Sequence, residues 1–217
     1  MFHYKKERRG KVYEVGRVAG YEIRGDTTEV TLIFPRKLPM QKHMTAAGVD
    51  FEDGRHITPI QRKKIYATLR DISDYTGYMP EEAKEWMKYL HIARTGVRYF
   101  SLSNCSVETA GSFINTLIDY CLENGVQLLD NLTERTEDIS HMLYKCILEK
   151  KCSICGRDGE IHHVDAIGMG NDRKTYDDSS NRKICLCRKH HSIAHQMGNK
   201  RFFQNYHVYG IVVKGET

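Results

Sequence analysis

Three short runs decide the fold of this chain: Cys152-Ser-Ile-Cys155, His162-His163 and Cys187-Arg-Lys-His190-His191-Ser-Ile-Ala-His195. Together with Cys185, they hold four of the seven cysteines and five of the eleven histidines. Cysteine and histidine at such short and repeated spacings are typical of metal sites. The pattern contains more ligands than one metal ion needs, so it predicts two separate sets.

The first set has the spacing of a structural zinc site. Zinc prefers thiolate and imidazole ligands in a tetrahedron, and a Cys-x-x-Cys run presents two sulfurs from one turn. Cys152 and Cys155 have this spacing, and Cys187 and His190 repeat it. They predict a Cys3His zinc site that joins two distant loops and stabilises a small domain. Cys185 competes as a ligand, but only Cys187 keeps the two-residue gap to His190.

The second set is the histidines that the zinc site does not use. His191 and His195 are four residues apart, which places both imidazoles on one face of a helix. His162 and His163 are adjacent, so on a strand they point to opposite faces. One of them can enter a metal site while the other faces a substrate and deprotonates a water molecule. The alternative is a second structural zinc site or a histidine-rich surface.

These runs resemble the HNH endonucleases, the ββα-metal group that includes colicin nucleases and many homing endonucleases. The shared pattern is a knuckle, a histidine doublet in Ile161-His162-His163-Val164, a central Asn181, and a second knuckle that leads into a helix with a histidine pair. His190 stands where a cysteine is usual, and Asn181 lies one residue further from the helix than is common.

The resemblance implies a role for each of these side chains. His163 would be the general base, and Asn181 would orient the loop or the base. His162, His191 and His195 would hold a catalytic Mg²⁺, Mn²⁺, Ni²⁺ or Zn²⁺ ion, beside the structural Zn²⁺. The reaction would be hydrolysis of a phosphodiester that leaves a 5′ phosphate.

Composition agrees with a folded protein that binds nucleic acid. The 217 residues are 40% hydrophobic, and no apolar run approaches the roughly 20 residues of a membrane span. Residues 150–201 carry eleven Lys/Arg against six Asp/Glu, an excess equal to the net charge of +5. This excess fits a phosphate backbone, and Arg182, Lys183, Arg188 and Lys189 are the candidate contacts. Seven cysteines, mostly in metal spacing, favour a reducing cytosol, and Cys105, Cys121 and Cys146 are expected in the core.

The front of the chain predicts strands and then helices. Residues 11–35 are β-branched and aromatic around a turn at Gly25-Asp26, which favours a hairpin. Helices are expected from Thr58-Pro59, from Pro80 and from Ser106, with stops at Gly77 and Gly125. A further connecting helix is expected over residues 131–150. We therefore predict an α+β fold with three parts: residues 1–130, a small sheet with helices; residues 131–150; and residues 151–217, the ββα-metal HNH module.

Residues 1–130 show a second resemblance, to the Orf family of phage recombination proteins. It rests on Ile57-Thr-Pro-Ile-Gln-Arg-Lys-Lys-Ile-Tyr66, Ile72-Ser-Asp-Tyr-Thr-Gly-Tyr78, Lys84-Glu-Trp-Met-Lys88 and Phe100-Ser-Leu-Ser103. It implies a domain that binds single-stranded DNA and single-strand-binding protein, a homodimer, and a phage or prophage protein in the bacterial cytosol. Arg62, Lys63, Lys64, Arg94 and Arg98 could track a phosphate backbone. Unpaired bases could stack on Tyr66, Tyr75, Tyr78, Trp86, Tyr99 and Phe100.

Three functions remain open at this point. The first is a metal-dependent DNA endonuclease of phage recombination or replication, with a front part that binds single-stranded DNA. The second is a recombination mediator whose HNH module only binds DNA on a zinc-stabilised frame. The third is a zinc-stabilised regulator without enzymatic activity. His163 favours the first, because a binding module has no use for a histidine beside a complete set of metal ligands.

Overall fold

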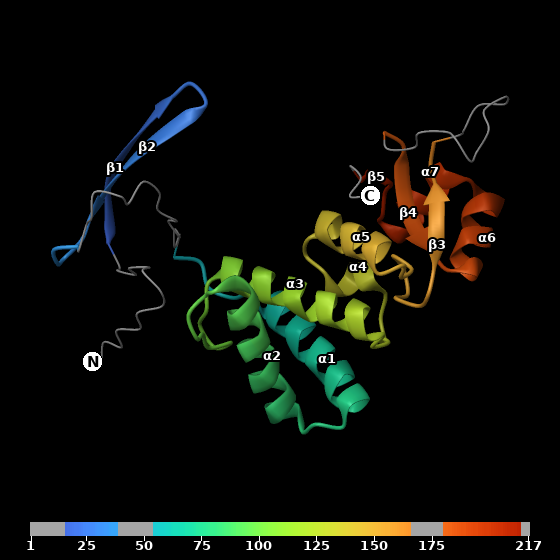
Figure 1. Cartoon of the computed structure of the whole chain (residues 1–217), viewed down its shortest axis with the longest axis horizontal. Coiled ribbons are helices and arrows are strands. Elements are labelled where there is room, and N and C mark those ends of the chain that lie inside the picture. Colours follow the sequence, from blue (N-terminus) through green and yellow to red (C-terminus); the bar gives the residue numbers. More distant parts are fainter. Residues whose placement is uncertain (1–15, 39–53, 166–179, 214–217) are drawn as a thin grey trace. The chain divides into compact units, whose positions relative to one another are not determined.

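Two small antiparallel sheets and seven helices make up the part of the chain that the structure describes. This computed structural model describes residues 16–38, 54–165 and 180–213. The chain divides into two compact units, Met1–Phe51 and Glu52–Thr217. The second unit carries the helices (Figure 1) and the predicted metal ligands. The predicted α+β class is confirmed.

The first unit contains a β-hairpin. Strands β1 (Arg17–Arg24) and β2 (Thr27–Ile33) pair in antiparallel fashion, with Tyr21 opposite Val30. The turn falls at Gly25-Asp26. Gly25 has a φ of +59°, a backbone conformation that residues with a side chain rarely adopt. The hairpin prediction is confirmed for this segment. Residues 11–15, which were also expected to form a strand, lie outside the described residues.

The second unit begins with three helices whose ends follow the capping signals. They are α1 (Pro59–Thr76), α2 (Pro80–Thr95) and α3 (Val107–Asn124). The Thr58 hydroxyl accepts a hydrogen bond from the Gln61 backbone N–H, and the Gln61 side chain accepts one from the Thr58 N–H. This reciprocal pair satisfies two backbone donors at the start of α1. The predicted starts of all three helices are confirmed, as are the stops of α1 at Gly77 and of α3 at Gly125.

The stretch expected to form one connecting helix contains two helices. Helix α4 is a single turn (Leu132–Arg135), and α5 (Ile139–Leu148) starts afresh after a break. Thr136 is extended at the end of α4, and the Asp138 carboxylate caps α5 by accepting from the His141 backbone N–H. The prediction of one continuous helix over residues 131–150 is therefore wrong, because a local side-chain cap replaces the helical hydrogen bonds.

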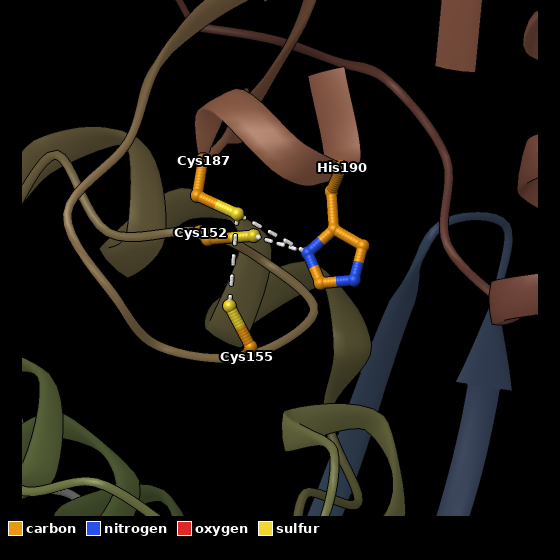
Figure 2. A group of neighbouring side chains, drawn as sticks. All are labelled: Cys152, Cys155, Cys187 and His190. Atoms are coloured by element: carbon orange, nitrogen blue, oxygen red, sulfur yellow. Dashed lines mark hydrogen bonds between the residues drawn. The ribbon is translucent and has the colours of Figure 1, made fainter. Parts of the chain in front are cut away.

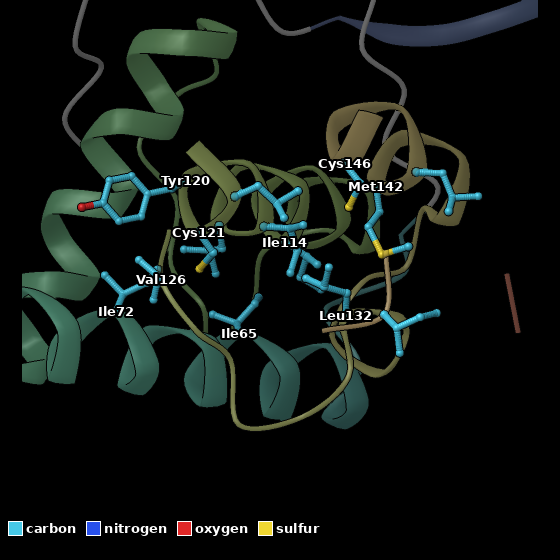
Figure 3. Packing of buried hydrophobic residues seen from close by; sticks show 14 of the residues in the cluster. Ile65, Ile72, Ile114, Tyr120, Cys121, Val126, Leu132, Met142 and Cys146 are labelled. Carbon is cyan, nitrogen blue, oxygen red and sulfur yellow. The ribbon is translucent and has the colours of Figure 1, made fainter. Parts of the chain in front are cut away.

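Helix α5 is the last helix of the helical part, α1 to α5, and connects it to the metal-binding part, which runs from Cys152 to β5. It packs against α3 on one side and against strands β4 and β5 on another. The buried apolar cluster accordingly runs without a gap from α1, through α3 and α5, to β4, α6 and α7. Figure 3 shows part of it, with Ile114 and Cys121 of α3 and Met142 and Cys146 of α5. Cys105, Cys121 and Cys146 are buried as predicted.

The metal-binding part is a three-stranded antiparallel sheet with two helices, which lie in the chain between the second and third strands. The strand order is β3 (Glu160–His163), β4 (Arg182–Leu186) and β5 (Ile211–Val212). Helix α6 (Arg188–Met197) packs on β4, and α7 (Asn199–Tyr206) packs on α6. In residues 16–38, 54–165 and 180–213, no helix is long and apolar enough to cross a membrane.

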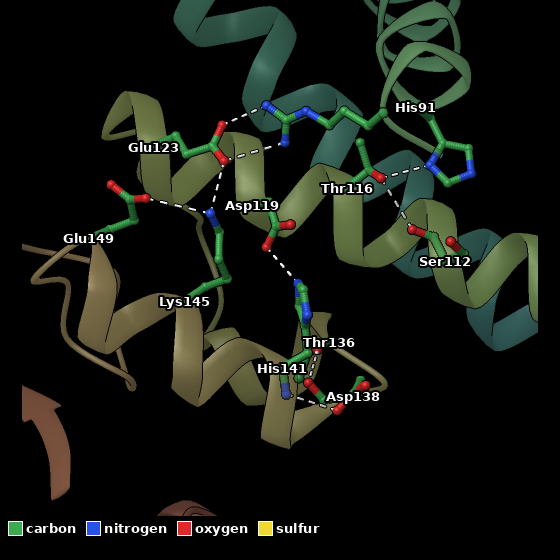
Figure 4. Close-up of polar contacts among 11 residues, drawn as sticks. His91, Ser112, Thr116, Asp119, Glu123, Thr136, Asp138, His141, Lys145 and Glu149 are labelled. Carbon is green, nitrogen blue, oxygen red and sulfur yellow. Dashed lines mark hydrogen bonds and ion pairs between the residues drawn. The ribbon is translucent and has the colours of Figure 1, made fainter. Parts of the chain in front are cut away.

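Polar contacts fix α5 against α3 (Figure 4). The Lys145 ammonium donates to the Glu123 carboxylate at 3.0 Å, and Arg94 of α2 reaches the same carboxylate at 2.7 Å. His141 Nε2 lies 2.8 Å from the Asp119 carboxylate. The hydrogen bond that His141 donates to Asp119 is the main cause that raises the pKa of His141 above its ordinary value of 6.5.

This pair predicts a pH-dependent contribution to stability. A raised folded-state pKa means that the folded protein holds the His141 proton more tightly than the unfolded chain. The contribution is fully present below about pH 6.5, the ordinary histidine value, and is lost as the pH rises through the folded pKa. We expect His141→Gln to lose this contribution, so that its deficit in free energy of unfolding is larger at about pH 6 than at about pH 9.

Urea denaturation at several pH values and constant excess zinc measures this deficit. His207→Asn is the matched control, because it replaces an exposed histidine at the end of α7 with a residue that tolerates the left-handed backbone there. A deficit that does not change with pH would contradict the role of the His141–Asp119 pair.

Candidate metal centres

Cys152, Cys155, Cys187 and His190 converge on one point (Figure 2). Their sulfur and ring nitrogen atoms all lie within 4.8 Å of one another. The Cys155 and Cys187 sulfurs are 3.8 Å apart, and His190 Nδ1 lies 3.4 Å from the Cys152 sulfur and 3.3 Å from that of Cys187. The structure therefore brings together the four side chains that the sequence predicts as a structural zinc site.

The spacing of these atoms fits a tetrahedral zinc ion. Zinc–sulfur bonds of about 2.3 Å place two sulfur ligands about 3.8 Å apart, and a sulfur and an imidazole nitrogen about 3.6 Å apart. The observed separations agree with these values to within a few tenths of an ångström. Three thiolates and one imidazole are also a ligand set that zinc prefers. The cluster can therefore hold a structural zinc ion.

Backbone hydrogen bonds shape both halves of this cluster. The Gly156 N–H donates to the Cys152 carbonyl at 2.8 Å, and Gly156 has a φ of +68°, which closes the turn between the two cysteines. The Ser153 N–H donates to the Cys185 carbonyl, which ties this turn to strand β4. Cys187 is the N-cap of α6, so the second pair of ligands lies on the first turn of that helix.

The competing cysteine, Cys185, lies in the hydrophobic core rather than in the cluster. It is fully buried on β4, opposite Ile161 of β3, and burial raises the pKa of its thiol to about 12. Cys155 differs, because its hydrogen bond with Cys152 lowers the pKa of Cys155 and raises that of Cys152. The two cysteines thus share a proton and favour one thiolate, whereas Cys185 stays a neutral thiol.

The second cluster contains His162 from β3 with His191 and His195 from α6. The Nε2 atoms of His191 and His195 are 3.0 Å apart, and the His162 ring centre lies 4.7 Å and 5.1 Å from the other two ring centres. Two imidazole nitrogens on one zinc ion lie about 3.4 Å apart. The three rings are therefore close enough to share one metal ion, and the structure brings together all three predicted ligands.

Two polar side chains orient the rings of this cluster. The Glu160 carboxylate accepts a hydrogen bond from His191 Nδ1 at 2.6 Å, which leaves Nε2 of His191 facing His195. The Asn199 side-chain oxygen lies 3.0 Å from Nε2 of His162. His162 is buried, and burial lowers its pKa, so its ring is neutral at pH 7, as a metal ligand must be.

The two remaining catalytic candidates lie on β3 and directly before β4. His163 follows His162 on β3 and is half-buried, opposite Lys183 of β4. Asn181 is buried directly before β4, and its side-chain nitrogen has no hydrogen-bond partner among the residues that the structure describes. Residues 166–179 lie outside the described residues. The roles of both side chains stay predictions.

The basic candidates of the metal-binding part fall into two groups. Arg188 and Lys189 are exposed on the first turn of α6. Arg182 instead pairs with the Asp165 carboxylate at 2.5 Å, and its own backbone N–H donates to the same carboxylate at 2.8 Å. This pairing lowers the pKa of Asp165 and joins the segment directly after β3 to the start of β4. Lys183 is half-buried on β4.

The basic candidates of the helical part are mostly bound within the protein. Arg62 donates to the carbonyl oxygens of Leu102 and Ser103, and Lys64 donates to that of Thr136. Arg94 pairs with Glu123. Lys63 and Arg98 are exposed. Among the aromatic candidates Tyr66, Tyr75, Tyr78, Trp86 and Tyr99 are exposed, whereas Phe100 packs against His91 and Phe113.

Three side chains next to these sites were not found by sequence reasoning. Glu160 could have been found, because it lies two residues before His162 and thus on the same face of strand β3. Asp165 and Asn199 carry no such signal, since their partners are 17 and 37 residues away in the chain. Their contacts depend on how β4 and α7 pack in three dimensions.

Two strands, a helix, a Cys3His cluster and three histidines at their junction define a ββα-metal module. A family model described as "Putative HNHc nuclease" matches residues 34–217. Because this match covers most of the chain, the protein belongs to the HNHc nuclease family. The match also spans the helical part, α1 to α5, and not only the ββα-metal module. No curated protein and no solved structure matches the chain.

The Cys3His cluster predicts a specific dependence of stability on zinc. Free zinc at about 1,000 times its dissociation constant adds about 4 kcal/mol to the free energy of unfolding of a protein that binds it only when folded. We expect Cys187→Ala to lose most of this increment, because three ligands and an open position hold zinc more weakly. Zinc content and urea denaturation with and without excess zinc measure the effect.

Cys185→Ala is the matched control, since it removes a neighbouring buried thiol outside the cluster. It should keep one bound zinc ion and the full zinc-dependent increment, despite a general loss of about 1 kcal/mol from the core. Equal zinc responses in the two variants would show that the cluster does not hold the ion.

Proposed function

We propose that this protein is a metal-dependent DNA endonuclease. The observation that carries the proposal is the position of His163, which directly follows a ligand of the three-histidine cluster on strand β3. Adjacent residues on a strand point to opposite faces, so binding a metal and accepting a proton can fall to different residues, His162 and His163. Membership of the HNHc nuclease family supports the same reaction and a DNA substrate.

His162, His191 and His195 would hold the catalytic ion, and the Cys3His cluster would hold a structural Zn²⁺. Imidazole ligands suit zinc, nickel and manganese, and cellular availability would also allow magnesium. When bound, the divalent ion supplies positive charge that stabilises the phosphate and the departing oxygen. Three protein ligands leave coordination positions for the substrate, as a catalytic site requires.

The His163 ring would act as the general base. It takes a proton from a water molecule, and the water oxygen forms a new bond to phosphorus while the bond from phosphorus to the 3′ oxygen breaks. The products are a 5′ phosphate and a 3′ hydroxyl, which receives a proton from solvent. Asn181 would orient the loop or the base, since its buried amide nitrogen has no partner among the described residues.

Basic side chains around the module would contact the DNA backbone. Arg188 and Lys189 are the better candidates, because both are exposed on the first turn of α6. Arg182 has its guanidinium on the Asp165 carboxylate, so a phosphate would have to compete with that ion pair. Such contacts hold the DNA in place without reading its sequence.

For the helical part we propose binding of single-stranded DNA. Its support is the set of exposed aromatic rings on and beside α1 and α2: Tyr66, Tyr75, Tyr78, Trp86 and Tyr99. Aromatic faces stack with unpaired bases of any sequence. The basic side chains give weaker support, because Arg62, Lys64 and Arg94 already have partners within the protein.

From the resemblance of the front of the chain to the Orf family, we propose that this activity serves phage recombination or replication, inside the bacterial host. The resemblance also suggests contact with single-strand-binding protein and a homodimer. The alternative function keeps these partners but not the catalysis: a recombination mediator whose HNH module only clamps DNA. The two functions differ in one residue's role, that of His163.

We expect His163→Ala to abolish cleavage. Loss of a general base lowers the rate by about 10²–10⁴-fold, while folding and DNA binding do not need this ring. Labelled single-stranded, duplex and branched DNA are incubated with zinc-loaded protein and added Mg²⁺, Mn²⁺ or Ni²⁺. EDTA is the metal-free arm. Cleavage rate and DNA affinity are measured separately.

His207→Asn serves as the control for loss of a histidine from the same module, and it should cleave like the unsubstituted protein. Cleavage that survives His163→Ala would refute the assignment of the base. DNA binding without cleavage by the unsubstituted protein, under every metal, would favour the mediator.

For the helical part we expect Tyr78→Ala to weaken binding of single-stranded DNA. One stacked base contributes about 1–3 kcal/mol, which corresponds to roughly 5- to 150-fold in affinity. Trp86 is the only tryptophan, and its ring lies edge-on to Tyr78 at 6.1 Å. Its fluorescence should therefore be quenched when an oligonucleotide binds, and titration of this quenching gives the affinity.

The matched control is Tyr144→Ala, because Tyr144 is also exposed but lies on α5. It should bind single-stranded DNA like the unsubstituted protein. Equal affinities for the two variants would contradict a stacking surface on α1 and α2.

A further inference from the structure

Asn199 occupies the first position of α7, directly after α6 ends. Gly198 joins the two helices with a φ of +81°, a backbone conformation that favours glycine. Helix α7 is anchored by Phe202, which is fully buried in the core. The Asn199 side chain is thus held from two directions, by the turn after α6 and by the packing of α7.

The carboxamide of Asn199 bridges His162 of strand β3 and Val164, which directly follows that strand. Its nitrogen donates to the Val164 carbonyl oxygen at 3.2 Å, and its oxygen lies 3.0 Å from Nε2 of His162. The Val164 carbonyl can only accept a hydrogen bond, so the amide nitrogen must face it. The amide oxygen must then face His162, and because that oxygen also only accepts, Nε2 of His162 has to carry the hydrogen.

A neutral imidazole has one protonated nitrogen and one lone pair. With the hydrogen fixed on Nε2, the lone pair of His162 is on Nδ1. We propose that Asn199 is a positioning residue that fixes the Nε2–H tautomer of His162 and thereby selects Nδ1 as its metal-binding atom. This inference rests on the proposed metal site and adds a residue from α7 to it.

His191 supports this inference, because its Nδ1 rather than its Nε2 is the nitrogen that is hydrogen-bonded outside the cluster. Glu160 accepts from Nδ1 of His191, so His191 presents Nε2 to the cluster. Each of these two ligands therefore has its outer nitrogen hydrogen-bonded to an acceptor on a different element. Such outer partners orient ligating histidines and raise their basicity, and their loss typically weakens metal binding about 10–100-fold.

Two substitutions separate the hydrogen bond to His162 from the hydrogen bond to Val164. Asn199→Ala removes both. Asn199→Asp keeps an oxygen that accepts from His162 Nε2 but has no N–H for the Val164 carbonyl. Asn205→Ala is the matched control, because Asn205 is exposed on the same helix and its side chain makes only a 3.9 Å contact with the Met197 sulfur.

The first readout is the tautomer of His162 in full-length, zinc-loaded protein labelled with ¹⁵N-histidine. Long-range ¹H–¹⁵N correlation spectra distinguish a protonated from an unprotonated ring nitrogen. We expect Nε2–H in the unsubstituted protein, in Asn199→Asp and in Asn205→Ala, and a mixture of tautomers in Asn199→Ala. Added Ni²⁺ should perturb Nδ1 of His162. An Nδ1–H tautomer in the unsubstituted protein would overturn the proposal.

The second readout is Ni²⁺ affinity, measured by calorimetry on the same zinc-loaded proteins. We expect Asn199→Ala to bind Ni²⁺ about 10–100-fold more weakly, and Asn199→Asp to stay within about tenfold of the unsubstituted protein. Asn199→Ala that binds Ni²⁺ as tightly as the unsubstituted protein would overturn the proposal. Equally weak binding by both variants would also overturn it, because only the hydrogen bond to Val164 would then matter. No Ni²⁺ binding by the unsubstituted protein would overturn it as well.

Neither readout needs DNA cleavage. If the protein binds Ni²⁺ with the expected tautomer but does not cut DNA, the proposed nuclease function fails and the role of Asn199 stands. If it cuts DNA but Asn199→Ala has the tautomer and affinity of the unsubstituted protein, the nuclease stands and the role of Asn199 fails.

Discussion

The Cys3His cluster is the constraint on which the rest of the module depends. Its ligands come from a turn before β3 and from the first turn of α6. Strand β3 and helix α6 are also the two elements that carry the three-histidine cluster. Strand β3 begins five residues after Cys155, and α6 begins directly after Cys187. A zinc ion that joins the two beginnings therefore also sets the distance between His162 on one element and His191 and His195 on the other.

In the proposed function, the two clusters separate stability from chemistry over a very short distance in the chain. His190 and His191 are neighbours on α6, yet one faces the cysteines and the other faces His162. The first cluster has two fully or nearly buried ligands and three thiol groups, which suits a permanent zinc ion. The second has imidazole ligands only and includes the exposed His195, which leaves room for a substrate. Burial and ligand type thus point to different tasks.

Local signals made much of this arrangement predictable from the sequence. Ligand spacing identified both clusters, since a two-residue gap and a three-residue gap each have one natural geometry, on a turn and on a helix. Capping residues such as Thr58 and Ser106 gave the helix starts, because their hydroxyls satisfy backbone donors locally. The break between α4 and α5 was missed, because threonine and aspartate, the residue types at positions 136 and 138, also occur inside helices. Only the capping hydrogen bond between Asp138 and His141 reveals the new start.

Long-range packing was not predictable in the same way. The sequence suggested a division between residues 130 and 150, and this functional division stays a prediction, but the apolar core continues across it because α5 packs on both α3 and β4. The contacts of Asn199 with His162 and of Asp165 with Arg182 likewise depend on tertiary structure. Several basic side chains that the sequence suggested for DNA, such as Arg62, instead satisfy carbonyl oxygens within the fold.

The central claim is that two metal ions bind in two chemically different sites. X-ray absorption spectroscopy on protein that contains one zinc and one nickel ion tests it most directly, because each absorption edge reports the ligands of one element. The account predicts three sulfur ligands and one nitrogen around zinc, and only nitrogen and oxygen around nickel. Sulfur in the nickel shell, or a zinc shell without sulfur, would contradict it.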